Sequence, residues 1–574
     1  RGSTRRTAAE MVPDEDEEEA DELAIDENMS LVERVKAYCN SSISVQRLVH
    51  VRELHACAEQ IGAEETLVHL LPLLAIISND VETPVRIAFA EQMVGFCKVL
   101  LAAPDVSHLL VDGDESSRQS AYEIVVSQCV PVLSKLLSGG SANDLSSPGG
   151  AQLCDAAAEA LVELAGLLKP HDVGHTVLTT VLCLAHDNEA EENRVVATQL
   201  LGALASTVGT ELCCEFVLPE IISLADDPVF RVRKAAALKV GSLCHVVGEA
   251  LSVQRLLPVF EVLARDEIWG VRKASVESLA EVAAAMPLEV RTAQLVTLLQ
   301  SFYDDGSRWV RIAACQALGP FIATLPSRCI SSDLLGLFTQ LAAPSNANAA
   351  DSDIGYYCAF NFPGVAQAVG SQRWGELSEA FVTLSNNVQW KVRRTLSYSL
   401  HELARVLGRE LTTAHLLPIF DRFLKDLDEV KVGAIQHLCS LLLVLDEEAR
   451  RRYLPTLAEV RAETDNWRFR QMLALQLADF GAIFPPADVR STLTPLALDL
   501  CTDQVAEVRI SAISQIGALL SLLLQAEEAA GAGKGQAAPG AAVEAGEAPS
   551  APAAVEAVEA AVGEARDRHE TTVA

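Results

Sequence analysis

The sequence predicts an all-α fold made of stacked helix pairs, and two periodic signals indicate it. The first is an arginine that recurs every 39 residues, at Arg194, Arg233, Arg272 and Arg311. The second is a proline, usually preceded by leucine, that recurs several residues into the first helix expected in a pair, at Pro72, Pro219, Pro258, Pro418, Pro455 and Pro495. A fixed period near forty residues is typical of helical-pair solenoids, and a proline that kinks the first helix is typical of the HEAT type. We therefore expect a HEAT-repeat α-solenoid of about eleven helix pairs.

One repeat, residues 249–287, shows why the units must stack. A first apolar-periodic stretch is followed by a short turn at 266–268 and by a second amphipathic stretch at helical spacing. A pair of this size cannot bury its apolar faces alone, so neighbouring pairs are needed to complete the core. In the preceding repeat we expect Asp227 to cap the second helix and Pro228 to occupy its first position.

The order of segments along the chain predicts the domain organisation. We expect the following segments: 1–29, a disordered acidic N-terminus; 30–344, N-terminal HEAT repeats with a flexible loop at 139–150; 345–355, an inserted loop; 356–525, C-terminal HEAT repeats; and 526–574, a disordered tail rich in Ala, Pro and Glu. The first repeat is expected to be truncated to one capping helix, 45–61. We also expect an irregular segment at 356–370, because Pro363 and Gly364 interrupt what should be a second helix.

Composition and charge limit the classes of partner. The net charge of −33 makes direct binding of nucleic acid unfavourable and leaves basic proteins as plausible partners. Fourteen scattered cysteines without zinc-ligand spacing are typical of buried, reduced thiols in a cytoplasmic or nuclear protein. The longest largely apolar run, 516–524, is too short to span a bilayer. We therefore predict no nucleic-acid partner, no membrane partner, and a cytoplasmic or nuclear location.

The motifs that carry catalysis are missing from the sequence. It contains no phosphate-binding loop, no nucleophile elbow and no His-Glu-x-x-His zinc motif. The HEAT enzyme deoxyhypusine hydroxylase binds two irons through periodic His-Glu pairs, whereas this chain has two isolated ones, at His401-Glu402 and His569-Glu570. We therefore predict a protein that is not an enzyme, with no catalytic residue, no cofactor and no metal.

The recurring arginines have two interpretations. The first is a structural ladder, in which each guanidinium bonds a carboxylate in the turn of the adjacent repeat and fixes the stagger between repeats. The second is direct contact with a partner protein. The expected ladder residues are Arg194, Arg233, Arg272, Arg311, Arg393 and Arg509.

Tryptophans at the start of the second helices also have two interpretations. Trp269, Trp309, Trp390 and Trp467 lie two or three residues before the ladder position or its equivalent. They either cap the core between turns or are exposed anchors of the kind that dominate interface energetics. Trp374 lies in a first helix, where packing is expected.

Three runs of residues resemble one family. They are Tyr303-Asp304-Asp305-Gly306-Ser307-Arg308-Trp309-Val310-Arg311, Phe360-Asn361-Phe362-Pro363-Gly364-Val365 and Gln389-Trp390-Lys391-Val392-Arg393-Arg394. They are similar to the protein phosphatase 4 regulatory subunit 1 family, HEAT proteins related to the scaffold subunit of protein phosphatase 2A. The resemblance implies a non-catalytic subunit that holds the catalytic subunit of a Ser/Thr phosphatase and presents substrate proteins to it.

The resemblance also implies where partners bind. In the related scaffold family partners dock along the ridge of turns within the repeats, with the catalytic subunit on the C-terminal repeats. Carried onto this chain, the partner-binding residues are Trp390, Lys431, Trp467, Arg468 and Glu507. The short 345–355 insertion and the pairs Val432-Gly433 and Phe469-Arg470 depart from the family pattern. The acidic array leaves an alternative function open, an importin-like transport receptor for basic cargo.

Overall fold

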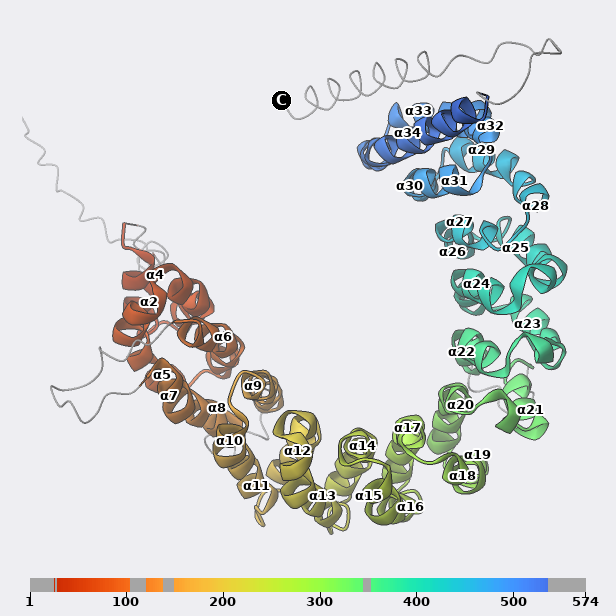
Figure 1. The fold of residues 1–574 in the computed structure, drawn as a ribbon. Helices are drawn as coiled ribbons and strands as arrows, with labels where there is room; N and C mark the ends of the chain where they lie inside the picture. Colours follow the sequence, from red (N-terminus) through yellow and green to blue (C-terminus); the bar gives the residue numbers. More distant parts are fainter. Residues whose placement is uncertain (1–24, 26–27, 104–119, 138–148, 344–352, 535–574) are drawn as a thin grey trace, which may run out of the picture. The chain divides into compact units, whose positions relative to one another are not determined.

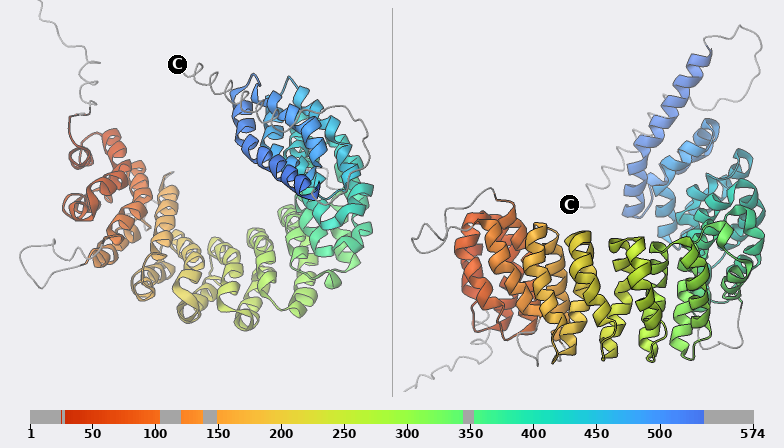
Figure 2. Two further views of the ribbon diagram at one scale, coloured as in Figure 1. Left: turned by 45° about the horizontal axis from the view of Figure 1, so that its top comes forward. Right: turned by 60° about the horizontal axis from the view of Figure 1, so that its bottom comes forward.

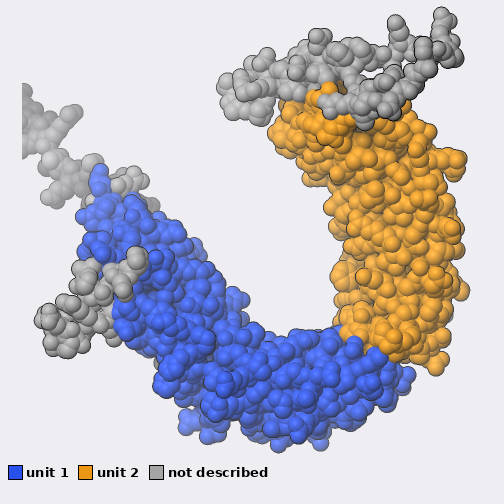
Figure 3. Space-filling model, viewed as in Figure 1, with its two compact units in different colours: residues 1–310 blue, residues 311–574 orange. Residues whose placement is uncertain are grey.

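The structure is a computed structural model of the 574-residue chain, and it describes residue 25 and residues 28–103, 120–137, 149–343 and 353–534. The described residues form helices and no strand, which confirms the predicted all-α class. They divide into two compact units, 1–310 and 311–574 (Figure 3). Within each unit, helix pairs follow one another as a row of stacked repeats (Figures 1 and 2).

Unit 1 ends within α20. Its α-helices are α2 (Leu31–Tyr38), α3 (Ser44–Arg52), α4 (Leu54–His69), α5 (Leu71–Ile77), α6 (Thr83–Leu101), α7 (Ala121–Ile124), α8 (Val130–Leu137), α9 (Gly150–Ala165), α10 (Pro170–Asp172), α11 (Thr179–Ala185), α12 (Glu191–Leu212), α13 (Leu218–Leu224), α14 (Phe230–Val247), α15 (Glu249–Leu251), α16 (Leu257–Leu263), α17 (Trp269–Ala285), α18 (Leu288–Val290), α19 (Val296–Tyr303) and the start of α20 (Arg308–Ala323).

Unit 2 continues the same organisation. Its α-helices are α21 (Ser332–Gln340), α22 (Ile354–Val369), α23 (Ser378–Ser385), α24 (Trp390–Leu411), α25 (Leu417–Phe423), α26 (Asp428–Gln436), α27 (Leu438–Leu442), α28 (Glu447–Arg451), α29 (Leu454–Ala462), α30 (Trp467–Leu475), α31 (Leu477–Ile483), α32 (Pro486–Asp488), α33 (Thr494–Cys501) and α34 (Ala506–Lys534). Two 3-10 turns, Ser327–Cys329 and Ser371–Glu376, complete it.

The second helices of successive repeats pack side by side. In unit 1 α12 lies against α14 and α14 against α17, and in unit 2 the row runs α22, α24, α26, α30 and α34. In α14, α17, α24, α26 and α30 the third residue is fully buried, as Val232, Val392 and Phe469 show. In these helices the residue that follows it carries the ladder side chain. The core therefore lies between consecutive pairs, as stacking of amphipathic helices requires.

The first helix of most repeats contains a π-helical turn where the sequence predicts a kink. These turns are Val125–Cys129, Val173–Leu178, Cys213–Val217, Ser252–Leu256, Arg291–Leu295, Thr412–Leu416 and Val489–Leu493. A proline follows such a turn by two residues at Pro219, Pro258 and Pro418. Proline is tolerated there because the widened turn already lacks the regular backbone hydrogen bond that proline cannot donate. The turns at 173–178 and 291–295 have no such proline, so proline fits the distortion and is not its sole cause.

A glycine followed four residues later by a hydroxyl ends several second helices. Gly248 has φ 84°, a backbone conformation that strains other residues, and the first helix of the next repeat begins after it. The buried Ser252 hydroxyl then donates to the Cys244 carbonyl at 3.1 Å. Gly62 with Thr66 and Gly408 with Thr412 repeat this geometry. It satisfies carbonyls that the end of a helix leaves without a backbone partner.

Four expectations about local structure are wrong. Helix α22 runs unbroken through Pro363 and Gly364. The first repeat is a full pair, because α2 packs against α3 and α4. Helix α34 continues to Lys534, so the predicted tail, 526–574, begins inside it. Pro228 precedes α14, and the Asp227 carboxylate accepts a hydrogen bond from the Val229 N–H instead of capping from the helix start. Three predicted segments lie mostly outside the described residues. They are the N-terminus 1–29, of which residues 25, 28 and 29 are described, and the loops 139–150 and 345–355.

Two helical stretches of the described chain are long and apolar enough to cross a membrane, judged by length and composition. They are Glu191–Leu224 and Ala506–Ala526, and the bent pair α4 and α5 would add a third if it formed one span. The apolar run 516–524, which the sequence analysis judged too short to span a bilayer, is therefore part of a longer candidate membrane span, Ala506–Ala526. Within the array the first stretch is broken at Gly209 by its positive φ, and α34 packs against α30, α31 and α33.

Close packing of α26 on α24 makes Gly433 sensitive to substitution. A Cβ at this position would lie 2.8 Å from the backbone nitrogen of Tyr398 and 2.7 Å from its ring. We expect Gly433→Ala to lower the free energy of unfolding by about 1–2 kcal/mol, because overpacking exceeds the gain in helix propensity. The control is Gly517→Ala on the exposed face of α34, where nothing lies within 4 Å and a small gain in stability is expected. Equal effects of the two substitutions on urea unfolding would contradict this reading.

Candidate functional site

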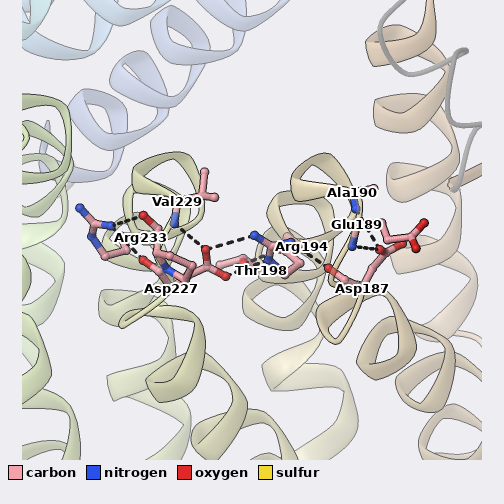
Figure 4. Close-up of polar contacts among 9 residues, drawn as sticks. Asp187, Glu189, Ala190, Arg194, Thr198, Asp227, Val229 and Arg233 are labelled. Carbon is pink, nitrogen blue, oxygen red and sulfur yellow. Dashed lines mark hydrogen bonds and ion pairs between the residues drawn. The ribbon is translucent and has the colours of Figure 1, made fainter.

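The rung at Arg194 links α12 to the next repeat. Arg194 Nε donates to Asp227 Oδ2 at 2.8 Å, and Nη2 donates to Oδ1 at 3.2 Å (Figure 4). Arg194 Nη1 donates to the Asp187 carbonyl in its own turn at 2.8 Å. Asp227 Oδ1 also accepts from the Val229 N–H at 2.8 Å. Each rung therefore fixes a turn and joins two consecutive repeats through a bidentate, charge-assisted pair.

The same rung recurs along both units at a sequence separation of 33 residues. The pairs are Arg47–Asp80, Arg194–Asp227, Arg233–Asp266, Arg272–Asp305, Arg393–Asp426 and Arg470–Asp503, at 2.6–2.8 Å. Sequence reasoning missed Arg47 and Arg470, because Gln46 and Phe469 replace the valine before the arginine.

Two predicted ladder arginines differ from this pattern. Arg509 donates Nη1 to the carbonyls of Asp503 and Gln504 in its own turn, at 2.8 and 3.1 Å. No carboxylate of the described residues pairs with it. Arg311 occupies the equivalent position in α20, but the residue 33 positions later is Pro344, which has no carboxylate and lies outside the described part of the chain.

Lys431 belongs to the ladder as well. It is the fourth residue of α26, as Arg393 is of α24, and its Nζ lies 3.0 Å from Glu463 Oε2. It also lies 4.8 Å from the centre of the Phe469 ring. The sequence analysis placed the repeat position at Val432, two residues late, and assigned Lys431 to partner binding. The structure shows this side chain bonded to the next repeat.

Four ladder aspartates have pKa values shifted toward the charged form. For Asp266, burial alone would raise the pKa, but hydrogen bonds from Arg233 and from the Ile268 N–H outweigh it and hold the pKa below its usual value. For Asp426 the hydrogen bond from Arg393 is the largest cause of a lowered pKa. Asp80 and Asp503 are shifted in the same direction. The ladder therefore requires ionised aspartates.

A groove lies between α22 and α24 and is lined partly by residues of two of the resemblance runs. Its volume is about 840 Å³, within the range of ligand-binding clefts. The α22 wall includes Tyr356 and Phe360, and the α24 wall includes Trp390, Lys391, Arg394 and Tyr398. We refer to it as the α22–α24 groove.

The two phenylalanines of the Phe-Asn-Phe-Pro-Gly-Val run have opposite roles. Phe360 is 64% exposed and lies 6.4 Å from the Tyr356 ring in the groove wall. Phe362 is fully buried, with Phe381 at 5.4 Å and Trp374 at 6.3 Å between ring centres. Side chains two positions apart on a helix point to nearly opposite sides. The same run therefore supplies both a core anchor, Phe362, and an exposed aromatic surface, Phe360. Trp374 packs in the core, as its first-helix position predicts.

The groove carries charged groups of both signs. Lys391 and Arg394 lie within the first turns of α24, and the Arg394 guanidinium lies 5.3 Å from the centre of the Tyr398 ring. Asp353 and Glu402 also line the groove, at the start of α22 and in the middle of α24.

The predicted partner-binding residues do not form one cluster. Trp390 lines the α22–α24 groove, and Lys431 is a ladder residue. Trp467 is half-buried at the start of α30 with the exposed Arg468 guanidinium 5.1 Å from its ring centre, and Glu507 is exposed in the first turn of α34. In unit 1 the remaining tryptophans are surface side chains, because Trp269 is 47% and Trp309 53% exposed. These two fit the interpretation as exposed anchors.

No group of three metal-ligating side chains occurs among the described residues. His401 stacks on His437 at 4.1 Å, and burial together with His437 lowers the pKa of His401 to about 4. The neighbouring Glu402 instead lines the groove, so the His-Glu pair divides between packing and surface. The cysteines are free and most are buried, although Cys183 is exposed.

Comparisons with known proteins bear on the groove-forming region. A family model described as the protein phosphatase 4 regulatory subunit 1 middle domain matches residues 358–460. The human and mouse serine/threonine-protein phosphatase 4 regulatory subunits 1 are each 47% identical to this chain over 178 residues, 31% of this chain. The match covers 19% of the length of each of these relatives.

Solved structures show the same type of fold. A crystal structure of importin beta has a TM-score of 0.64 at 14% identity and covers 92% of this chain and 66% of its own. Kap121p bound to Nup53p has a TM-score of 0.53 at 14% identity, covering 88% and 58%. At this identity the likeness concerns the fold alone, and it confirms the HEAT-type solenoid. The family model covers most of α22 and all of α24, and it confirms the resemblance over residues 358–460, which are similar to the middle domain of the protein phosphatase 4 regulatory subunit 1 family.

Proposed function

We propose that this chain is a non-catalytic regulatory subunit that binds the catalytic subunit of a Ser/Thr phosphatase of the protein phosphatase 4 type and presents substrate proteins to it. The observation that carries the proposal is the match of residues 358–460 to the family's middle domain, which contains most residues of the α22–α24 groove and the Arg393–Asp426 rung. The chain itself is expected to hydrolyse no phosphoester. A cytoplasmic or nuclear location, without membrane or nucleic-acid partners, belongs to the same proposal.

The turn ridge of unit 2 is the surface we assign to the catalytic subunit. Trp467 and Arg468 start α30, and Glu507 lies at the start of α34, with their side chains at least partly accessible. An arginine beside a tryptophan is a combination enriched in interface hot spots. Because the ladder side chains between them are engaged within the array, the ridge presents these residues on a firmly held backbone.

A binding assay with purified proteins tests this proposal. The full chain is expected to bind a protein phosphatase 4 type catalytic subunit, and Trp467→Ala with Arg468→Glu is expected to weaken binding at least tenfold (about 1.4 kcal/mol). The matched control is Phe230→Ala with Arg231→Glu, which changes an exposed aromatic residue and the adjacent exposed arginine at the start of α14 in unit 1 and should leave binding unchanged. Absence of binding by the unaltered chain would refute the proposal. Import of labelled basic cargo by the chain would favour the importin-like alternative instead.

A further inference from the structure

We infer that the α22–α24 groove is a docking site for a short acidic segment of a partner protein, which inserts an apolar or aromatic side chain among the groove aromatics and places carboxylates beside Lys391 and Arg394. This goes beyond the proposed phosphatase subunit role, because it concerns the groove along α22 and α24 rather than Trp467, Arg468 and Glu507, and it does not depend on which phosphatase binds at those residues.

The dimensions of the groove suit a linear peptide. Its α24 wall extends from Trp390 to Glu402, roughly 18 Å along the helix axis at 1.5 Å per residue. An extended peptide advances about 3.3 Å per residue, so about five residues fit along this wall. A volume of about 840 Å³ leaves room for side chains of that segment.

The aromatic side chains supply an anchoring surface. Phe360 is 64% exposed, and Tyr356, Trp390 and Tyr398 are half-buried around it. When a partner side chain covers their exposed ring surface, the burial of that surface contributes favourably to the binding free energy. Phe362 and Trp374 hold the opposite side of α22 in the core, so the wall is fixed before a partner arrives. A preformed wall reduces the ordering cost of binding.

The charges indicate the sign of the partner. Lys391 and Arg394, the second and fifth residues of α24, form no ion pair with a described residue, whereas basic side chains at these positions of other second helices are paired, as Arg231 is with Glu191 and Lys273 with Glu277. They lie at the end of the groove where α22 and α24 both begin, and helix N-termini add partial positive charge there. Asp353 is the acid at this end, and Glu402 lies about 12 Å further along α24 than Arg394. Two bases and two helix starts against one acid favour an anionic segment.

An acidic segment with an apolar anchor fits both features of the groove. A purely acidic segment would leave Phe360 and Trp390 uncovered, and a basic one would be repelled by Lys391 and Arg394. The chain as a whole carries a net charge of −33, so most of its surface repels such a segment. Binding is therefore directed to this groove, and it should weaken as salt screens the two cations.

Selection from a random twelve-residue peptide library displayed on phage, with the full chain as bait, tests the inference. Enriched peptides are expected to carry Phe, Trp or Leu within a few residues of several Asp or Glu. A fluorescent synthetic copy of the most enriched peptide should bind the chain at least tenfold more weakly after Lys391→Glu with Arg394→Glu, and also after Phe360→Ala. These side chains are exposed or line the groove, so the fold is expected to persist, and circular dichroism checks it.

The control variant is Arg405→Glu with Arg409→Glu, which makes the same charge change on exposed side chains of α24 outside the groove and should alter affinity less than threefold. Failure to enrich peptides, enrichment of neutral or basic peptides, or equal loss in the control would overturn the inference. A peptide that binds only when phosphorylated would also overturn the acidic assignment. The Lys391 and Arg394 variant should still bind the phosphatase catalytic subunit, so the two proposals can fail separately.

Discussion

Replacement of Arg393 by alanine is expected to lower the free energy of unfolding of unit 2 by about 2–4 kcal/mol. The guanidinium makes two bonds to Asp426 at 2.7 Å and two to the turn carbonyls of Asn387 and Val388, at 2.7 and 3.1 Å. The side chains are only 16% and 13% accessible, so water cannot fully replace the lost partners. Removing the arginine leaves a poorly solvated carboxylate, which costs more than the pair contributed.

A double-mutant cycle separates the rung from nonspecific effects. Arg393→Ala, Asp426→Ala and the double variant are compared by urea unfolding and by hydrogen exchange of α24 and α26, since a repeat array need not unfold in one step. We expect a coupling energy above about 1 kcal/mol. The control is Arg409→Ala, an exposed arginine on the same helix. Independent effects of Arg393 and Asp426 would show that the rung does not stabilise the array.

The second large effect is a loss of stability in acid that comes from several rungs together. Asp80, Asp266, Asp426 and Asp503 have pKa values lowered by folding. A lowered folded-state pKa contributes stability that is complete above the unfolded value, near 3.9, and is lost as the pH falls through the folded-state pKa. We therefore expect the thermal midpoint to fall steeply below about pH 4.

Asp426→Asn identifies the ladder as the source of this acid loss. The variant should be less stable than the unaltered chain at pH 7, and the difference should shrink as the pH falls below the unfolded-state value near 3.9 toward the lowered pKa of folded Asp426. Glu429→Gln, which alters an exposed carboxylate of α26, should show no such convergence. A difference between Asp426→Asn and the unaltered chain that stays constant from pH 7 to pH 3 would contradict this explanation.

The repeat architecture could be predicted from the sequence because one arginine per repeat meets one aspartate of the next. The period of the sequence equals one helix pair, and the 33-residue contact follows from it. Lys431 was not assigned to the ladder because both Val430 and Val432 fit an apolar pattern. The interval from Val392 to Val430 is 38 residues instead of 39, so the 39-residue period does not identify the buried valine. Only packing shows that Val430 is the buried residue.

The groove could not be predicted, although the runs that form it stood out in the sequence. Its existence depends on which face of α22 meets α24, and on α22 continuing through Pro363. A proline within a helix usually argues for an interruption, but the core contacts of Phe362 outweigh the lost hydrogen bond here. The Gly248–Ser252 pattern could have been found in the sequence, because the same four-residue spacing recurs at Gly62 and Gly408. It was missed because a search for apolar periodicity does not detect glycine and serine or threonine.

The rungs also determine how the chain responds to mechanical load. Each joins only consecutive repeats, so tension applied along a unit is borne by the bonds in series rather than shared among them. Among the rungs, Lys431–Glu463 has a single ammonium where the others have a guanidinium with two donor groups, so we expect this rung to break before the other rungs of unit 2. Releasing one repeat of 39 residues would lengthen the chain by up to about 130 Å. A pulled unit would therefore act as an extensible tether that lengthens in discrete steps.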